Sequence, residues 1–356
     1  MPPEWAQTGT VSDKIRRLRA RAQLLHRPQG GGVVEVVRHL LAVQAQDIAS
    51  FPLALRARVA DLTAADVTAA RHAREIVRCW GPRGTLHLIA AEDLPWLFPL
   101  VRTAPAGSLR RLRQLGVEAD PGEAVRLVAA ALAGQGPLGK AELGERLARA
   151  GLAAEGQAIV HLAMLAAREG LVVLGPDRAG KATYVHAADW LGEPLPTTVT
   201  DRDAALRELA RRYRRAHDPA EPADLASWSG LPLGDAERAW RGPAEERPRP
   251  IAAESVRVVR LVPGYDEYLL GWRTRELSVP EPHRALIHPG GGIIRPALLV
   301  DGKAVGTWRT RRTPRHIDVT VEPFERLPVD VPDTVDEEVT DLGRFFGLPA
   351  KLTIAS

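Results

Sequence analysis

Apolar residues in the first two-thirds of the chain recur three and four positions apart, which is the spacing of amphipathic helices. Short β-rich runs, punctuated by glycine and proline, follow these helical stretches in two places. Helices are expected over residues 11–25, 33–44, a short stretch capped by 63–66, 123–133, 140–150 and 156–169; strands are expected over 75–78, 85–89, 171–174 and 182–186. Helices followed by a two-strand ribbon form a winged helix, so two such modules are predicted, over residues 1–117 and 118–195.

The last part of the chain, residues 196–356, begins with helices and then becomes rich in strands. Helices are expected over 201–216, 221–231 and 235–241, with Gly230 at the turn of a helix-turn-helix. Strands are expected over 256–261, 295–300 and 304–309, with a hairpin turn at Asp301-Gly302. The predicted fold is therefore α+β, with three tandem winged-helix modules and a β-rich C-terminal part.

Composition narrows the class of protein. The 356 residues are 45% hydrophobic and 26% charged, which is typical of a globular chain. No apolar run is long enough to span a bilayer, and Met1 to Trp5 lacks the features of a signal peptide. The single cysteine, Cys79, excludes an internal disulfide and a cysteine-based zinc site. We expect a cytoplasmic protein without a metal or cofactor.

Positive charge is unevenly distributed. The formal net charge is +4 and the pI is about 9.5. Arginine clusters occur at 14–21, 110–113, 211–215 and 309–315, whereas 330–341 is acidic. Several arginine clusters in separate modules suit phosphate contacts along a DNA duplex. Solvated helix faces explain any one cluster equally well.

Two short stretches carry the candidate chemistry. The first is Val43-Gln44-Ala45-Gln46-Asp47, in which the spacing of Gln44 and Gln46 directs both amides to one side of an extended segment. Two amides that face a cavity can hold a water molecule without carrying charge. Asp47 is expected to cap the next turn rather than to act in catalysis. The second stretch runs from Arg78 to Leu88 and contains W-x-x-R-G-T-L-H at 80–87.

The pairing of V-Q-A-Q-D with W-x-x-R-G-T-L-H resembles the AlkZ-type DNA glycosylases, a winged-helix family that includes the bacterial YcaQ-like proteins. Two later stretches strengthen the resemblance: D-E-Y-L-L-G at 266–271 and D-G-x-x-x-G-x-W at 301–308. The similarity extends from about residue 13 to about residue 321 and is weakest in the middle module.

This resemblance implies an architecture and a set of site residues. Three winged helices would form a C-shaped body around a basic channel, and a hairpin would reach into it. We place that hairpin at 298–309, with Lys303 near its tip. The resemblance implies catalysis by Gln44 and Gln46. Contacts with double-stranded DNA are expected from Arg83, His87, Lys303, Arg309, Arg311 and Arg312. For Arg83, a structural role in its own turn is an equal alternative, and for His87 the alternative is a structural or surface role.

The resemblance also implies a substrate class. Alkylation at N7 of guanine or N3 of adenine places positive charge on the leaving base, so the base need not be protonated. Two amide carbonyls can then orient the water and face the developing positive charge on the sugar. Members with a Gln-x-Gln pair are associated with bulky N7-guanine adducts and interstrand crosslinks, often as self-resistance of antibiotic producers. A monomeric, monofunctional DNA glycosylase is expected.

Other interpretations remain open from the sequence. A non-enzymatic winged-helix transcription regulator or a toxin-binding protein would share the fold. A bifunctional glycosylase with lyase activity would need an amine, and no lysine lies near the glutamine pair in the sequence. Asp266 and Glu267, as neighbours in a strand, are expected to point apart and form no paired-carboxylate site.

Overall fold

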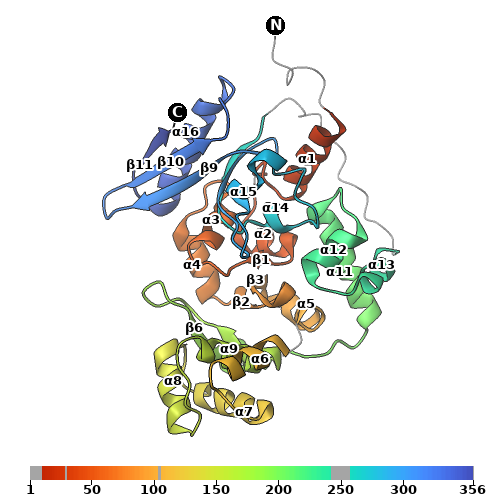
Figure 1. The fold of residues 1–356 in the computed structure, drawn as a ribbon, viewed down its shortest axis with the longest axis vertical. Helices are drawn as coiled ribbons and strands as arrows, with labels where there is room; N and C mark the ends of the chain where they lie inside the picture. The colour runs from red at the N-terminus through yellow and green to blue at the C-terminus, as the bar shows by residue number, and fades with distance from the viewer. Residues whose placement is uncertain (1–9, 29, 103–105, 242–256, 356) are drawn as a thin grey trace.

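The computed structural model describes residues 10–28, 30–102, 106–241 and 257–355 (Figure 1). The N-terminal residues considered for a signal peptide and the predicted strand start at Val256 lie outside these ranges. Among the described residues, no helix is both long and apolar enough to cross a membrane. The observed mixture of helices and strands confirms the α+β class.

The first part of the chain has the expected order of helices followed by a ribbon. Its elements are α1 (Val11–Ala22), α2 (Val33–Leu40), β1 (Val43–Gln44), α3 (Ser50–Arg56), α4 (Ala64–His72), β2 (Ile76–Trp80), β3 (Leu86–Ala90), α5 (Leu94–Val101) and α6 (Ala106–Gln114). The helix predicted to reach Gln44 ends four residues earlier. Leu41 adopts a positive φ of 69°, which an α-helix does not accommodate, and the chain then enters β1.

The second part joins the first through a common sheet. It comprises α7 (Pro121–Leu132), β4 (Leu138–Gly139), α8 (Lys140–Arg149), α9 (Gln157–Arg168), β5 (Val172–Leu174), β6 (Thr183–His186) and α10 (Ala187–Leu191). The six strands run in the order β1-β3-β2-β5-β6-β4, and Arg78 of β2 pairs with Leu174 of β5. The two ribbons expected to be separate wings therefore form one continuous sheet.

The third part contains helices and a second sheet. The helices are α11 (Arg202–His217), α12 (Pro222–Ser229), α13 (Leu233–Trp240), α14 (Glu267–Leu270), α15 (Arg284–Ile287) and α16 (Val331–Phe346). The strands are β7 (Val259–Val262), β8 (Ala297–Val300), β9 (Lys303–Arg312), β10 (Ile317–Pro323) and β11 (Ala350–Ile354), in the order β11-β10-β9-β8-β7. Pairing of Val300 with Lys303 confirms the hairpin at Asp301-Gly302. The acidic stretch at 330–341 lies largely in α16.

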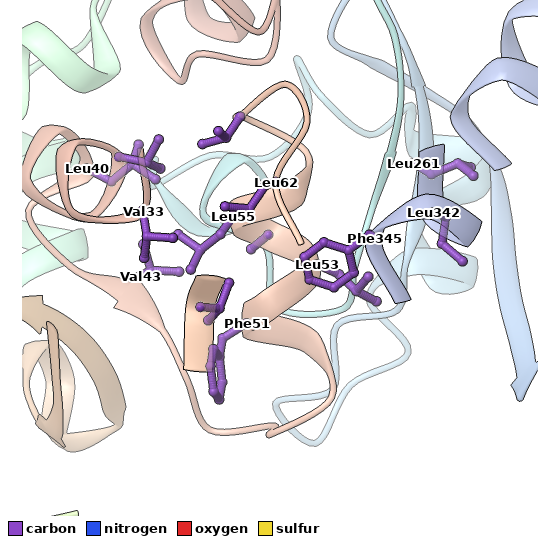
Figure 2. Close-up of a cluster of buried hydrophobic side chains, with 14 of the residues drawn as sticks. Val33, Leu40, Val43, Phe51, Leu53, Leu55, Leu62, Leu261, Leu342 and Phe345 are labelled. Carbon is purple, nitrogen blue, oxygen red and sulfur yellow. The ribbon is translucent and has the colours of Figure 1, made fainter. Parts of the chain in front are cut away.

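One hydrophobic core connects the first part to the end of the chain. Val33, Leu40 and Phe51 belong to the same buried cluster as Leu261 and Phe345 (Figure 2). Leu53 of α3 lies close to Phe345 of α16 in Figure 2, and both belong to this cluster. Burial of these side chains against one another holds the C-terminal sheet onto the segment that carries the glutamine pair.

Buried charges reinforce this junction. Arg56 of α3 is fully buried, and its guanidinium donates to Glu338 of α16 at 3.0 Å and to Asp341 at 2.8 Å. Arg27 lies 2.9 Å and Arg260 lies 3.4 Å from the other oxygen of the Glu338 carboxylate. Because each buried charge has an opposite partner, the helix α16 is fixed in position relative to α3.

The lone cysteine is part of the sheet interior. Cys79 lies on β2 opposite His87 of β3, and it is buried. Burial raises the pKa of the Cys79 thiol to about 12. The side chain therefore remains a protonated thiol at neutral pH.

Candidate active site and DNA-facing surface

Gln46 lies two residues beyond the end of β1, an edge strand that is hydrogen-bonded to β3. At the next two residues, Ala45 and Gln46, the regular backbone hydrogen bonds to β3 are interrupted. Ala45 N donates to Leu86 O at 2.7 Å, but Ala45 O accepts from Arg78 Nε at 2.9 Å. Leu86 N donates instead to Gln46 Oε1, at 3.2 Å. The side-chain oxygen of the exposed Gln46 thus takes the place of a backbone carbonyl as the acceptor for Leu86 N. This hydrogen bond orients the Gln46 amide.

Gln44 is much less accessible than Gln46. It is only 8% exposed, and its Oε1 is buried without a hydrogen-bond partner. Its cross-strand partner is His87, so the two side chains leave the same face of the sheet. Gln46 is exposed but Gln44 is buried, so the two amides do not open together onto one cavity as expected.

His87 does not contact solvent. Its exposed fraction is 0%, and its Nδ1 lies 3.0 Å from Thr85 O. Burial lowers the pKa of His87 to about 3, so the ring is neutral at neutral pH. The prediction that His87 contacts DNA is wrong for this conformation, because no DNA atom could reach a side chain enclosed in the sheet interior.

Glu267 holds the backbone of Gln44 in place. Its carboxylate is buried; Oε1 accepts from Gln44 N at 2.7 Å and Oε2 accepts from Trp228 Nε1 at 3.1 Å. Burial raises the pKa of Glu267, and the charge of Arg83 opposes this shift. The sequence did not identify this role. Its only signal was the D-E-Y-L-L-G stretch, which was singled out for its resemblance.

The neighbouring carboxylate, Asp266, is used differently. It caps the short helix α14 by accepting from Tyr268 N. Its two oxygens also accept from Nη1 and Nη2 of the fully buried Arg58, each at 2.8 Å. The strand expected at 266–267 is thus a helix start. The two carboxylates do serve different partners, as expected, and form no paired site.

Arg83 has a structural role in its turn, which was the alternative to a DNA contact. The residue is half-buried in the turn between β2 and β3, with a φ of 57°. Its guanidinium donates to the Trp228 carbonyl in α12. The charge of Glu267 stabilises the protonated form of Arg83 and partly offsets the lowering of its pKa by burial. Arg83 connects the first ribbon to the third part of the chain, so its predicted contact with DNA is not supported by this position.

The other predicted DNA contacts are all exposed on β9. Lys303, Arg309, Arg311 and Arg312 lie along this one strand. Arg309 forms an ion pair with Glu322 of β10, and the Arg312 guanidinium lies 4.7 Å from the Phe346 ring centroid. Arg311 makes no ion pair with another described residue. This strand is the central one of the C-terminal sheet, and it carries four exposed basic residues.

The β8–β9 hairpin, which was expected to reach into a DNA channel, is held against the protein at its turn. Its turn, Asp301-Gly302, packs against α1: Arg17 lies 3.1 Å from Asp301, and Tyr268 donates to Gly302 O at 2.8 Å. A Cβ at Gly302 would lie 2.8 Å from Arg16 O. Lys303 is therefore not at a free tip. The exposed hairpin is the next one, β9–β10, whose turn carries Pro314 and Arg315.

A cleft of about 440 Å³ lies between α3 and the C-terminal sheet, beginning at the residue after Gln46. Asp47 accepts from Ala49 N at 3.1 Å and from Ser50 Oγ at 2.5 Å, which confirms its expected capping of the next turn. The cleft is lined by Asp47, Ala49, Ser50, Leu53, Pro263, Gly264, Arg295, Pro296, Thr307, Trp308, Arg309, Thr310 and Glu322.

Comparison with known proteins identifies the family. The family model "DNA glycosylase AlkZ-like" matches residues 37–345. A curated protein of Streptomyces sahachiroi, the interstrand DNA cross-link repair glycosylase, is 26% identical over 88% of this chain and 91% of its own length. The solved structure of S. sahachiroi DNA glycosylase AlkZ has the same fold, with a TM-score of 0.72 and 24% identity over 97% of this chain and 100% of its own. The family match favours an enzyme over a transcription regulator. The chain belongs to the AlkZ-like DNA glycosylases.

Proposed function

We propose that the protein hydrolyses the N-glycosidic bond of cationic alkylated purines in double-stranded DNA, chiefly guanines alkylated at N7. The observation that carries this proposal is the position of Gln46. Its exposed amide is fixed by the Leu86 backbone at a sheet edge, next to a cleft, in a DNA glycosylase. No general acid is needed, since the alkylated base already carries the charge that makes it a good leaving group.

Gln46 faces the reacting sugar in this proposal. An amide oxygen has two lone pairs, and Leu86 N uses one of them. The second lone pair is available to the attacking water or to the positive charge that develops on the sugar. A fixed dipole of this kind stabilises a transition state more than a mobile one, because it need not reorganise.

Gln44 is assigned a supporting role in orienting the water. Its Oε1 has no partner, and Glu267 holds its backbone nitrogen. The terminal torsion of a glutamine side chain is broad. A rotation of the amide toward Gln46 would turn the unused oxygen to the water that Gln46 binds. The reaction is hydrolytic, with no covalent intermediate on a lysine.

Bulky adducts and interstrand crosslinks are the proposed physiological lesions, in DNA repair or antibiotic self-resistance. The S. sahachiroi relative is named for cross-link repair, and this chain is similar to it over most of its length. We further propose that DNA lies in a basic channel of a C-shaped, monomeric body, with Arg309, Arg311 and Arg312 at phosphates. Their exposure on one strand supports this placement.

The direct test is base release from defined DNA. Duplexes that contain a single N7-methylguanine should yield free N7-methylguanine and an abasic site, whereas the unmodified duplex should yield neither. A strand break without added base would indicate a lyase and contradict the monofunctional mechanism. Tight binding of the damaged duplex without base release would contradict the proposed substrate.

A further inference from the structure

The cleft beside Gln46 has two walls from distant parts of the chain. One wall is the Asp47–Leu53 segment at the start of α3, and the other comes from β9 and β10. The Trp308 side chain on β9 lines the cleft. It is largely buried, and its Nε1 donates to Val262 O at 2.7 Å, so the ring orientation is fixed. The cleft is thus a formed feature of the junction between α3 and the C-terminal sheet.

We propose that this cleft receives the bulky substituent attached to N7 of the damaged guanine, and so selects for bulky lesions. This inference rests on the proposed function. N7 and N9 belong to the same five-membered ring, so a substituent on N7 begins only a few ångström from the bond that is broken. The cleft begins at Asp47, the residue that follows Gln46 in the chain.

The size and lining of the cleft fit an organic substituent. Its volume of about 440 Å³ is within the range of small-molecule sites. Leu53, Pro263 and Trp308 offer apolar contact, while the hydroxyls of Thr307 and Thr310 offer a few hydrogen bonds. An aromatic or alicyclic group with sparse polar atoms matches this lining, whereas a methyl group would leave the cleft empty.

The cleft has four charged side chains, Asp47, Arg295, Arg309 and Glu322, two of each sign. Arg309, the basic residue of the β9 wall, is already paired with Glu322 of the same cleft. Asp47 adds a carboxylate on the side nearest Gln46. The Asp47 carboxylate, next to the glutamine in the chain, attracts the charged imidazolium ring of an N7-alkylguanine.

A large side chain placed in the cleft should slow base release from bulky lesions but not from small ones. Thr310 is exposed, lines the cleft and lies in a strand that tolerates an aromatic residue. Single-turnover base release by Thr310→Trp is compared for two duplexes, one with N7-methylguanine and one with the N7-guanine monoadduct of an aromatic nitrogen mustard. Release of the bulky adduct should fall by about tenfold or more, as for a steric misfit in a pocket. Release of N7-methylguanine should stay within about twofold.

The matched control is Thr353→Trp, because Thr353 is exposed on β11 of the same sheet and does not line the cleft. It should release both lesions like the unmodified enzyme. Ala49→Phe fills the cleft from the opposite wall and should repeat the Thr310→Trp pattern, so misfolding of one variant leaves the proposal testable. Equal losses on both lesions, or no loss on either, would overturn the cleft assignment. Failure of the unmodified enzyme on both lesions would instead refute the proposed function.

Discussion

Glu267 Oε1 lies 2.7 Å from Gln44 N, so a buried carboxylate far along the chain holds the backbone of the candidate catalytic segment. The same carboxylate accepts from Trp228 in α12. One side chain of the third part thereby connects β1 to the helices that pack behind it. This makes Glu267 a positioning residue, whose effect on chemistry would pass through Gln44.

Replacing Glu267 should affect both the site and the fold. Glu267→Ala leaves two buried donors unpaired, and each costs about 1–3 kcal/mol. Glu267→Gln retains an acceptor oxygen for one of them. Base release should fall by about tenfold or more in the alanine variant and less in the glutamine variant, while affinity for an undamaged duplex changes little. A glutamine variant as slow as the alanine variant would argue for a role of the charge rather than of position.

Removing the accessible amide gives the sharpest test of the glutamine pair. Gln46→Ala should slow base release by about 10²-fold or more, the scale for one positioned dipole. Its affinity for the duplex should be nearly unchanged, because an uncharged amide contributes little to phosphate binding. Gln135→Ala, at an exposed glutamine in the second part of the chain, is the control. Full activity of Gln46→Ala would remove the proposed catalytic role.

Arg311 tests the DNA-facing surface. Arg311→Ala should weaken binding to all duplex sequences alike and reduce the slope of log K against log salt by about one unit. Titration of a labelled duplex at several salt concentrations measures both quantities. Arg126→Ala, at an exposed arginine on α7 at the opposite end of the molecule (Figure 1), should leave the slope unchanged. An unchanged slope in Arg311→Ala would place DNA elsewhere.

Glu338 should be essential for stability. Glu338→Gln removes the charge that faces Arg27, Arg56 and Arg260, and breaking a buried pair costs about 3–5 kcal/mol. Denaturant unfolding measures the loss. The adjacent Glu337→Gln, on the exposed side of α16, should change the free energy of unfolding by less than about 0.5 kcal/mol. Equal stability of the two variants would contradict the proposed importance of this cluster.

Burial of His217 predicts that the free energy of unfolding decreases in acid. Burial against Tyr213 and Trp228 lowers the pKa of His217 to about 3. The unfolded chain, with a histidine pKa near its ordinary 6.5, binds the proton more readily. The stabilisation from keeping His217 neutral and buried is thus fully present above about pH 6.5 and is lost as the pH falls toward 3. In His217→Phe, the denaturation midpoint should decline less steeply between pH 6.5 and 4.5; an equally steep decline would assign the effect to other groups.

The sequence predicted local structure well where pattern and turn chemistry agree. Periodicity located most helices, and Asp-Gly located the β8–β9 turn. It could not show which hairpin is anchored, because that depends on α1, almost three hundred residues earlier. The exposure of Gln46 and the burial of Gln44 likewise depend on Glu267 and His87, whose approach is set by tertiary packing. Burial of His87 left no local signal, because β3 is buried on both faces and the face that carries His87 is covered only by tertiary packing.

The buried thiol has a consequence for how the protein would react with the electrophiles that generate its proposed substrates. Electrophiles that modify guanine N7 also react with cysteine, but they require the thiolate form. Cys79 is enclosed by the sheet and stays protonated, and the sequence contains no second cysteine. The repair protein therefore presents no sulfhydryl target to the reagents whose damage it would reverse.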